Sequence, residues 1–312
     1  MVELAIVGIF LGIDGGGSKT TCEVGDAVSV RGRGTSSGSN VLRVGEHKAR
    51  DAFRAAIHEA CAAAGIAPSN VERTCVGVAG GARSETAEII RKILSKLVSG
   101  EIEVVGDMVI AMEAASGSGP GVVVIAGTGS IAYGRNAASE TARAGGWGFA
   151  ISDEGSGHWI GRAAVSAAMR AHDEGLNIAL LEGAMKSWGI STREQMILAA
   201  NSSPPPDFSA LFPAVVKAAE ASDRTAHEIL VRAGAELSRL AEIVIGRLFS
   251  GVESVPVAMS GGVFGNSALV RQIFYNNLRA HYPGVALNAT IVDPVKGALE
   301  LARKSARRGV GA

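Results

Sequence analysis

The sequence predicts a two-lobed α/β protein, and three observations support this prediction. The chain has 312 residues, more than one modest core needs and enough for two domains of about 150 residues each. Short apolar runs alternate with longer stretches of helical spacing, which is the order of an α/β fold. A strand, a glycine-rich turn and a return strand occur at 11–24 and again at 122–134. This echo indicates two related lobes that face each other across a cleft.

The first lobe is expected to alternate strands and helices. An apolar run at 5–13 predicts a strand that ends at Asp14 and a turn of glycines. Return strands are expected at 20–24 and 27–31. Apolar residues at helical spacing predict a helix at 46–64. The order then continues with a strand at 74–79, a helix at 85–98, a strand at 102–105 and a helix at 108–115.

The second lobe is expected to begin at a glycine-rich linker, 117–121, so that the boundaries are 1–117 and 118–312. After the repeated strand–turn–strand motif, helices dominate. They are expected at 156–171, 180–188, 193–200, 209–221 and 225–249. A strand at 255–259, a helix at 267–281 and a strand at 286–292 follow. Asp293 and Pro294 suit the start of a closing helix at about 293–304, which is expected to pack back on the first lobe.

Composition excludes several classes of protein. Thirty basic and 30 acidic residues give a formal net charge of zero, so the basic surface of a nucleic-acid-binding protein is not expected. Cys22, Cys61 and Cys75 are odd in number and lack Cys-x-x-Cys spacing, which predicts neither a disulfide framework nor a zinc site. The apolar run at 2–11 is too short to span a bilayer and lacks a basic leader and a cleavage site. We therefore expect a cytoplasmic protein that does not bind membranes.

Residues 12–20, Gly-Ile-Asp-Gly-Gly-Gly-Ser-Lys-Thr, are close to a P-loop. Ser18 separates Gly17 from Lys19, where the P-loop motif has them adjacent, and no helical pattern follows. As a hairpin, the segment brings backbone N–H groups within reach of phosphate oxygens, and Asp14 can hold hydrated Mg²⁺. A simple tight turn is the alternative interpretation.

Two further glycine-rich turns follow strands, at 126–130 and at 259–263. Each alone is commonplace, because close packing at a strand end also favours glycine. Three such turns in one chain favour a single nucleotide that is enclosed from both sides.

Two segments are candidates for substrate chemistry. Asp107 lies between a strand and a helix, where position alone favours a helix cap and a general base is the functional alternative. The glycine-rich segment 145–157 carries Trp147 and Asp153, an indole and a carboxylate that suit a sugar. Its structural interpretation has Trp147 in the core and Asp153 or Ser156 as a helix cap.

In this order, the segments resemble the BadF/BadG/BcrA/BcrD ATPase family, and most closely its N-acetylglucosamine kinase branch. The resemblance covers nearly the whole chain, and its most specific part is Gly-Gly-Trp-Gly at 145–148 followed by Ser-Asp-Glu-Gly-Ser at 152–156. It implies two ribonuclease-H-like lobes of the actin-like ATPase fold, with ATP and sugar in the cleft. It also implies a homodimeric kinase that transfers phosphate from ATP, with Mg²⁺, to the 6-hydroxyl of a small amino sugar, foremost N-acetylglucosamine.

The resemblance also implies roles for individual residues. Asp107 matches the catalytic base. The positions that match sugar-binding residues are Asn40, Asp107, Gly146, Trp147 and Asp153. Asp14, at the strand end, is expected to hold magnesium through water. The positions that match the nucleotide-binding motifs are Asp14, Gly15, Gly16, Gly17, Ser18, Lys19 and Thr20, then Gly127, Thr128, Gly129 and Ser130, and lastly the adenosine motif at 260–262 with Gly261 and Gly262.

One position departs from the kinase pattern. Ile131 stands where the vertebrate-type enzyme has an asparagine that touches the sugar, which leaves glucosamine and N-acetylmuramate as alternative substrates. A second alternative is an ATPase that activates a radical enzyme through an iron–sulfur cluster. The absence of a cluster-like cysteine pair disfavours that function. A third, a non-catalytic ATP-binding regulator, is disfavoured by Asp107.

Overall fold

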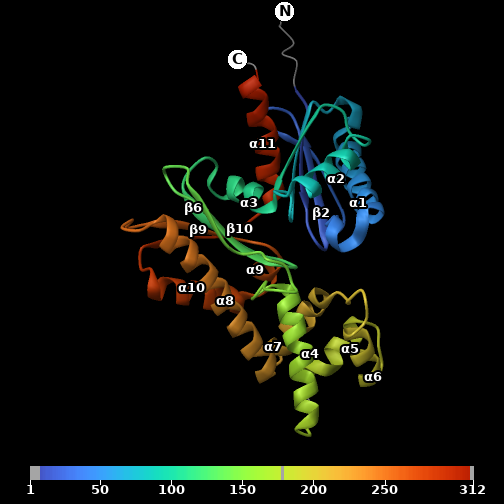
Figure 1. The fold of residues 1–312 in the computed structure, drawn as a ribbon, viewed down its shortest axis with the longest axis vertical. Helices are drawn as coiled ribbons and strands as arrows, with labels where there is room; N and C mark the ends of the chain where they lie inside the picture. The colour runs from blue at the N-terminus through green and yellow to red at the C-terminus, as the bar shows by residue number, and fades with distance from the viewer. Residues whose placement is uncertain (1–7, 177–178, 310–312) are drawn as a thin grey trace, which may run out of the picture. The chain divides into compact units, whose positions relative to one another are not determined.

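The computed structural model describes residues 8–176 and 179–309, which fall into two compact units (Figure 1). The first unit runs to Gly119 and resumes at Val292, and the second spans Pro120–Ile291. Residues 5–7 of the first predicted strand lie outside the described residues. Each helix in the described part of the chain is too short or too polar to cross a membrane.

Five strands form the sheet of the first unit, in the order β3-β2-β1-β4-β5. A meander of antiparallel neighbours, β1 (Phe10–Gly15), β2 (Lys19–Gly25) and β3 (Val30–Ser37), makes one half. β4 (Arg73–Val78) then pairs in parallel with β1, and β5 (Glu101–Gly106) pairs in parallel with β4. Parallel neighbours need crossover connections, and helices supply them here. The carboxyl ends of β1, β4 and β5 therefore lie at one edge of this sheet.

Helices cover both faces of this sheet, as Figure 1 shows. On one face, α1 (Val41–Ala64) packs on β2 and β3, and α2 (Ser84–Leu94) packs on β5. A short 3-10 turn, Pro68–Asn70, lies between them in sequence. On the other face, α3 (Asp107–Ser116) and α11 (Pro294–Gly309) pack on each other and on β1 and β4. Strand residues alternate between these two faces.

Helix α11 joins this unit from the far end of the chain and is held by close backbone packing. A Cβ on Gly12 of β1 would lie 2.3 Å from the backbone nitrogen of Leu299, and a Cβ on Gly297 would lie 2.0 Å from the carbonyl oxygen of Ile110 in α3. Glycine at both positions is therefore what allows α11 to lie so close to β1 and α3.

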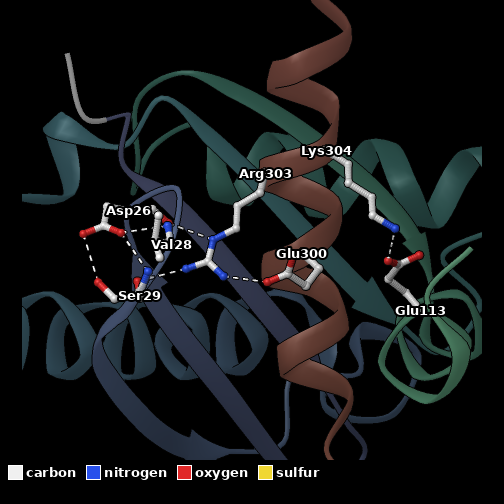
Figure 2. Close-up of polar contacts among 7 residues, drawn as sticks. All are labelled: Asp26, Val28, Ser29, Glu113, Glu300, Arg303 and Lys304. Atoms are coloured by element: carbon white, nitrogen blue, oxygen red, sulfur yellow. Dashed lines mark hydrogen bonds and ion pairs between the residues drawn. The ribbon is translucent and has the colours of Figure 1, made fainter. Parts of the chain in front are cut away.

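Two side chains on α11 add polar contacts (Figure 2). Arg303 is 7% exposed; its Nε donates to the carbonyl oxygen of Asp26 at 2.7 Å and its Nη2 to that of Ser29 at 2.9 Å. Lys304 forms an ion pair with Glu113, which is buried on α3. The last helix is thus bonded both to the turn between β2 and β3 and to α3.

The second unit repeats the sheet of the first. An antiparallel meander of β6 (Gly121–Ala126), β7 (Ser130–Arg135) and β8 (Thr141–Gly145) is followed by β9 (Val255–Ser260), parallel to β6, and β10 (Val285–Val292). The order β10-β9-β6-β7-β8 mirrors β5-β4-β1-β2-β3. The α/β class and the echo between the two halves of the sequence are therefore confirmed.

The helices of the second unit form two groups. Helix α8 (Arg224–Leu248) packs across β6, β7 and β8, and α10 (Ala268–His281) packs on α8. The other group extends from α4 (Gly157–Asp173), which contacts α5 and α7. The remaining helices are α5 (Ala179–Ser187), α6 (Arg193–Ala200), the 3-10 turn η2 (Phe208–Leu211), α7 (Phe212–Glu220) and α9 (Gly262–Asn266).

Some predicted boundaries are wrong, for identifiable reasons. The strand expected at 27–31 is β3, which spans Val30–Ser37, because Asp26 and Ser29 close a turn that ends only there. The helix expected at 46–64 begins earlier, at Val41, and contains a residue of non-helical conformation, Gly45. Strand β8 and helix α9 were not predicted, because each is five residues long and has no clear periodicity.

Candidate functional site

The glycine-rich turn of the first unit joins β1 to β2 and is bonded to the segment after β3. The N–H of Gly16 donates to the carbonyl oxygen of Lys19 at 2.9 Å, and the N–H of Ser39 donates to the carbonyl oxygen of Gly16 at 3.1 Å. Thr20 Oγ1 donates to the carbonyl oxygen of Ser37 at 2.7 Å. The turn is therefore a β-hairpin, as predicted, and not the start of a helix. Hydrogen bonds hold it to the segment after β3.

Asn40 directly follows Ser39, in the segment that is hydrogen-bonded to the hairpin. Its side-chain oxygen accepts a hydrogen bond from the N–H of Leu42 at 3.1 Å, which caps helix α1. A Cβ on Gly38, two residues earlier, would lie 2.2 Å from the carbonyl oxygen of Gly17. The fold thus places Asn40 beside the hairpin, and its side chain has at least a structural role.

One face of this sheet carries a group of charged side chains. Arg33, Glu23 and Gly12 lie opposite one another in neighbouring strands, and Thr21 and Asp14 form the next row on the same face. This is the face that α11 covers. The sheet register therefore places Asp14 diagonally next to Glu23, below the first residues of α11.

Asp293, just before α11, completes this group. Arg33 Nη1 lies 2.8 Å from Glu23 Oε1 and 2.7 Å from Asp293 Oδ2, so a single guanidinium bridges two carboxylates. Glu23 is buried, and burial raises the pKa of its carboxyl group. Without Arg33, two acids would face each other next to Asp14.

Asp14 itself is half-buried near the end of β1. Burial raises its pKa from 3.8 to about 7, and the carboxylates of Asp107 and Asp293 act in the same direction, while Lys19 and Arg33 oppose them. Desolvation and like charges both disfavour the ionised form of an acid. A cation bound near Asp14 would stabilise the ionised carboxylate.

Asp107 is the first residue of α3, directly after β5, and its side chain accepts a hydrogen bond from the N–H of Met108 at 2.9 Å. Burial raises its pKa, and this hydrogen bond lowers it. The residue before the helix is Gly106, so Asp107 caps from inside the first turn. Asp14 and Asp107 lie at the carboxyl ends of β1 and β5, on the sheet edge where open α/β sheets bind ligands.

These residues fit a magnesium ion that takes most of its ligands from water and phosphate. Among the described residues, no group of three or more histidine, cysteine or acidic side chains could hold a metal ion by itself. Mg²⁺ usually keeps several waters and takes one or two carboxylates together with substrate phosphates. Asp14, raised in pKa beside a glycine hairpin, fits that type of site.

In the second unit, the turn at 127–129 is bonded to the start of α4. The N–H of Gly157 donates to the carbonyl oxygen of Gly127 at 2.8 Å, and the N–H of His158 donates to that of Thr128 at 3.2 Å. Ser130 Oγ donates to the carbonyl oxygen of Glu154 at 2.7 Å. The second glycine-rich turn and the segment before α4 therefore form one assembly.

Asp153 belongs to this assembly. It is 7% exposed and has a φ of +70°, a left-handed conformation that aspartate adopts more readily than most residues. The side chain of Ser156, and not that of Asp153, caps α4, by accepting a hydrogen bond from the N–H of Trp159. The cap interpretation is thus correct for Ser156 only.

The third glycine-rich turn lies next to the second one. β9 pairs with β6 so that Ser260 is opposite Ile125, and Gly261 follows with a φ of +97°. A Cβ on Gly261 would lie 2.4 Å from the carbonyl oxygen of Ala126. Glycine is therefore required here both by the backbone conformation and by the close approach. Gly262 begins α9.

Trp147 is not a core residue, since 57% of its surface is exposed. The guanidinium carbon of Arg143 lies 4.1 Å from the centre of its ring, a cation–π contact. Gly146 packs on Ile131, because a Cβ there would lie 2.7 Å from the Ile131 side chain. The residue that departs from the kinase pattern therefore lies beneath the segment that carries Trp147.

The predicted site residues thus form two groups, one in each unit. The first unit brings together Asp14, the hairpin, Asn40 and Asp107. The second brings together the turn at 127–130, Gly146, Asp153 and Gly261. Sequence reasoning gave no site role to Arg33, Glu23, Asp293 or His158. The alternation of charged residues at 23, 31 and 33 across a predicted hairpin is the signal that could have identified Arg33.

Comparisons with known proteins agree with this picture. A model of the BadF/BadG/BcrA/BcrD ATPase family matches residues 11–302. The chain is similar to the N-acetylmuramic acid/N-acetylglucosamine kinase of Clostridium acetobutylicum, with 31% identity over 298 residues, which cover 94% of this chain and 97% of that protein. It is 28% identical over 313 residues to the N-acetyl-D-glucosamine kinase of Dictyostelium discoideum, which covers 95% and 98% of the two chains.

The fold has solved counterparts as well. A structure from Chromobacterium violaceum matches with a TM-score of 0.74 and 23% identity, and the match covers 95% of this chain and 99% of that one. This likeness confirms the predicted actin-like fold of two ribonuclease-H-like units. Because the family model spans nearly the whole chain, and a relative above 30% identity does the same, the chain belongs to the BadF/BadG/BcrA/BcrD ATPase family.

Proposed function

We propose that this protein is an ATP-dependent kinase that phosphorylates the 6-hydroxyl of an amino sugar, N-acetylglucosamine first and N-acetylmuramate or glucosamine as alternatives. The observation that carries the proposal is the placement of Asp14 and Asp107 at the carboxyl ends of β1 and β5, on one edge of the sheet and beside a glycine hairpin. The names of the two relatives, both amino-sugar kinases, support the substrate class.

Some residues bind the phosphates of ATP, and Asp107 activates the sugar hydroxyl. Backbone N–H groups of the turns at 15–20 and 127–130 hold phosphate oxygens. The glycines in these turns carry no side chain that would prevent close approach. Asp107 accepts the proton of the sugar hydroxyl while that oxygen forms a bond to the γ-phosphorus and the bond from this phosphorus to the β,γ-bridging oxygen breaks. Its raised pKa makes it a better proton acceptor than an ordinary aspartate.

Asp14 would hold Mg²⁺ through water, and bound magnesium would neutralise charge on the phosphates. Lys19, at the start of β2, adds a positive charge on the same hairpin. In the second unit, Trp147 offers an exposed apolar ring and Asp153 a buried carboxylate, the two chemistries that recognise the faces and hydroxyls of a sugar.

An ATPase that activates a radical enzyme is the alternative function outside the kinases, and the cysteines argue against it. Cys22, Cys61 and Cys75 are buried, with at most 1% of their surface exposed. Burial also raises the pKa of each thiol, whereas an iron–sulfur ligand must be a thiolate. The described part of the chain thus offers no cysteine placed to share a cluster with a second subunit.

The test is ADP release with Mg-ATP across N-acetylglucosamine, N-acetylmuramate, glucosamine, glucose and a buffer blank. We expect turnover with at least one amino sugar well above the blank, and phosphorus NMR of the product should show a 6-phosphate. ADP release that is equal with and without sugar would overturn the kinase, and a phosphate on another carbon would overturn the assigned hydroxyl.

A further inference from the structure

The segment 146–152, here called the 146–152 loop, stands out from the second unit. Trp147, Phe149 and Ile151 are 57%, 48% and 78% exposed, an unusual concentration of apolar side chains on one loop. Gly146 and Gly148 have φ values of +69° and +96°, so the backbone follows no regular element. The loop turns on itself, because the N–H groups of Ile151 and Ser152 both donate to the carbonyl oxygen of Gly148.

A ring contact joins the middle of this loop to the body of the unit. The ring centres of Phe149 and His158 lie 4.8 Å apart. His158 is 7% exposed, and its other side faces Phe208, with ring centres 5.1 Å apart in an edge-to-face arrangement. Phe208 in turn contacts Trp188 at 5.1 Å. Phe149 is thus the most exposed ring of a row of tilted and edge-to-face contacts that ends at Trp188, between α5 and α6.

The support under Phe149 is rigid. A Cβ on Gly161 of α4 would lie 1.9 Å from the carbonyl oxygen of Phe208, so helix and η2 meet backbone to backbone. The N–H of His158 also donates to the carbonyl oxygen of Thr128 in the candidate phosphate turn. The backbone of His158 is therefore hydrogen-bonded to the candidate phosphate turn, and its imidazole packs between Phe149 and Phe208.

We propose that Phe149 and His158 are positioning residues for sugar binding. Their ring contact holds the 146–152 loop so that Trp147, at one end, and Asp153, just beyond the other, are presented together to the sugar. This inference rests on the proposed function, because it assigns a role within the same reaction. Neither ring needs to touch the sugar.

A role of Phe149 in packing and a role in positioning predict different effects when its side chain is removed. A half-exposed phenylalanine that only packs contributes to stability and affects both substrates alike when it is removed. A positioning phenylalanine affects mainly the sugar, because the phosphate turn has bonds of its own, from the N–H of Gly157 to Gly127 and from Ser130 Oγ to the carbonyl oxygen of Glu154. An aromatic pair is worth enough that its loss should raise the sugar KM about three- to tenfold.

The experiment compares Phe149→Ala with Ile151→Ala by steady-state kinetics in both substrates, together with thermal midpoints. Ile151 is the matched control, because it is apolar, more exposed, on the same loop and without a ring partner. We expect Phe149→Ala to raise the KM for N-acetylglucosamine and leave the KM for ATP unchanged, with a slightly lower midpoint because the ring contact is lost. Ile151→Ala should leave all three unchanged. Phe149→Tyr, which keeps the ring, should restore the sugar KM.

Hydrogen exchange in the free protein supplies a readout that does not depend on activity: amides of the 146–152 loop should exchange faster in Phe149→Ala than in Ile151→Ala. An unchanged sugar KM in Phe149→Ala, or equal rises in both KM values, would overturn the inference while the kinase stands. A parent protein that phosphorylates no sugar would overturn the proposed function, and this inference with it.

Discussion

The carboxylate of Asp153 occupies the space that a side chain on Gly129 would need. A Cβ built on Gly129 would lie 2.7 Å from Asp153 Oδ2, closer than real Cβ atoms approach an oxygen. Gly129 belongs to the candidate phosphate turn and Asp153 to the candidate sugar-binding segment. The two parts of the proposed site in this unit therefore lie next to each other, and a side chain added at Gly129 must displace the Asp153 carboxylate.

Gly129→Ala should therefore impair both substrates. The new methyl group pushes the Asp153 carboxylate aside and also obstructs the approach of phosphate to the turn. We expect the KM values for ATP and for sugar both to rise, by roughly tenfold each, which is about 1.4 kcal/mol of binding. Steady-state kinetics in each substrate measures this.

Gly246→Ala is the matched control for this substitution. Gly246 lies exposed inside helix α8, with its nearest neighbour atom 3.6 Å from a built Cβ, so alanine fits. Alanine in a helix interior should stabilise the protein by about 0.5–1 kcal/mol and leave the kinetics alone. If Gly129→Ala behaves like this control, the contact with Asp153 has no functional weight.

Asp153→Asn isolates the carboxylate from its backbone. Asparagine tolerates the left-handed conformation at this position, whereas alanine adds strain of about 1 kcal/mol. We expect Asp153→Asn to raise the sugar KM about tenfold with little change in the ATP KM, because a charged acceptor of sugar hydroxyls is lost. Asp153→Ala should show the same kinetic change together with a lower thermal midpoint. A normal sugar KM for Asn would remove Asp153 from the sugar site.

Asp107→Asn tests the general base. Asparagine keeps the side-chain oxygen that accepts from the N–H of Met108, so α3 should keep its first turn. Loss of the proton acceptor should lower kcat by about 10²- to 10⁴-fold while ATP still binds. Single-turnover kinetics and ATP binding by calorimetry measure the two effects. Ordinary turnover in the Asn variant would leave Asp107 with only its capping role.

The sequence was informative where patterns are local. The repeat of strand, glycine turn and strand predicted the hairpin in each of the two sheets, because glycine turns between short apolar runs are short-range signals. The β1–β2 hairpin at Gly16 and the cap at Ser156 were likewise predictable from neighbouring residues. The segment 27–31 was misplaced because a turn held by Asp26 depends on side-chain hydrogen bonds that periodicity does not record.

Tertiary contacts escaped prediction for a different reason. The position of Asp293 beside Arg33 depends on α11, which is more than 250 residues away in sequence and packs through glycine contacts. His158 could be assigned no chemistry from sequence, because its neighbours Phe149 and Phe208 come from two other segments. Contacts between individual side chains of distant segments leave no periodic pattern in the sequence.

Arg303→Met should destabilise the first unit. Arg303 is buried, and its guanidinium satisfies the carbonyl groups of Asp26 and Ser29, which methionine cannot do (Figure 2). We expect a loss of about 1–3 kcal/mol in the free energy of unfolding, because the acceptor of buried Asp26 is left without this donor, whereas the Ser29 carbonyl oxygen keeps the N–H of Asp26. Urea denaturation measures it. Arg224→Met, at an exposed helical ion pair, is the control and should cost less than about 0.5 kcal/mol.

The last prediction concerns Asp14, whose pKa of about 7 lies well above its ordinary value of 3.8. Between these two pH values the folded protein keeps a proton that the unfolded chain has released. The free energy of unfolding therefore falls as pH rises from about 4 to 7, and the full cost is present above pH 7. Asp14→Asn removes this cost. It should stabilise the protein at pH 8 by at most about 4 kcal/mol, less at pH 5, and not at all below pH 3.8.

Function should respond in the opposite direction. If ionised Asp14 holds hydrated magnesium, Mg-ATP binds the deprotonated form, so affinity rises with pH through about 7 and binding near that pH releases a proton. Calorimetry in buffers of different ionisation enthalpy counts that proton. Asp14→Asn should bind Mg-ATP more weakly and release none, while its thermal midpoint at pH 8 exceeds that of the parent protein. On the proposed role of Asp14, the parent protein gives up stability to keep a carboxylate that holds hydrated magnesium. A midpoint gain that is the same at pH 5 and pH 8 would show that the substitution acts through packing and not through this charge.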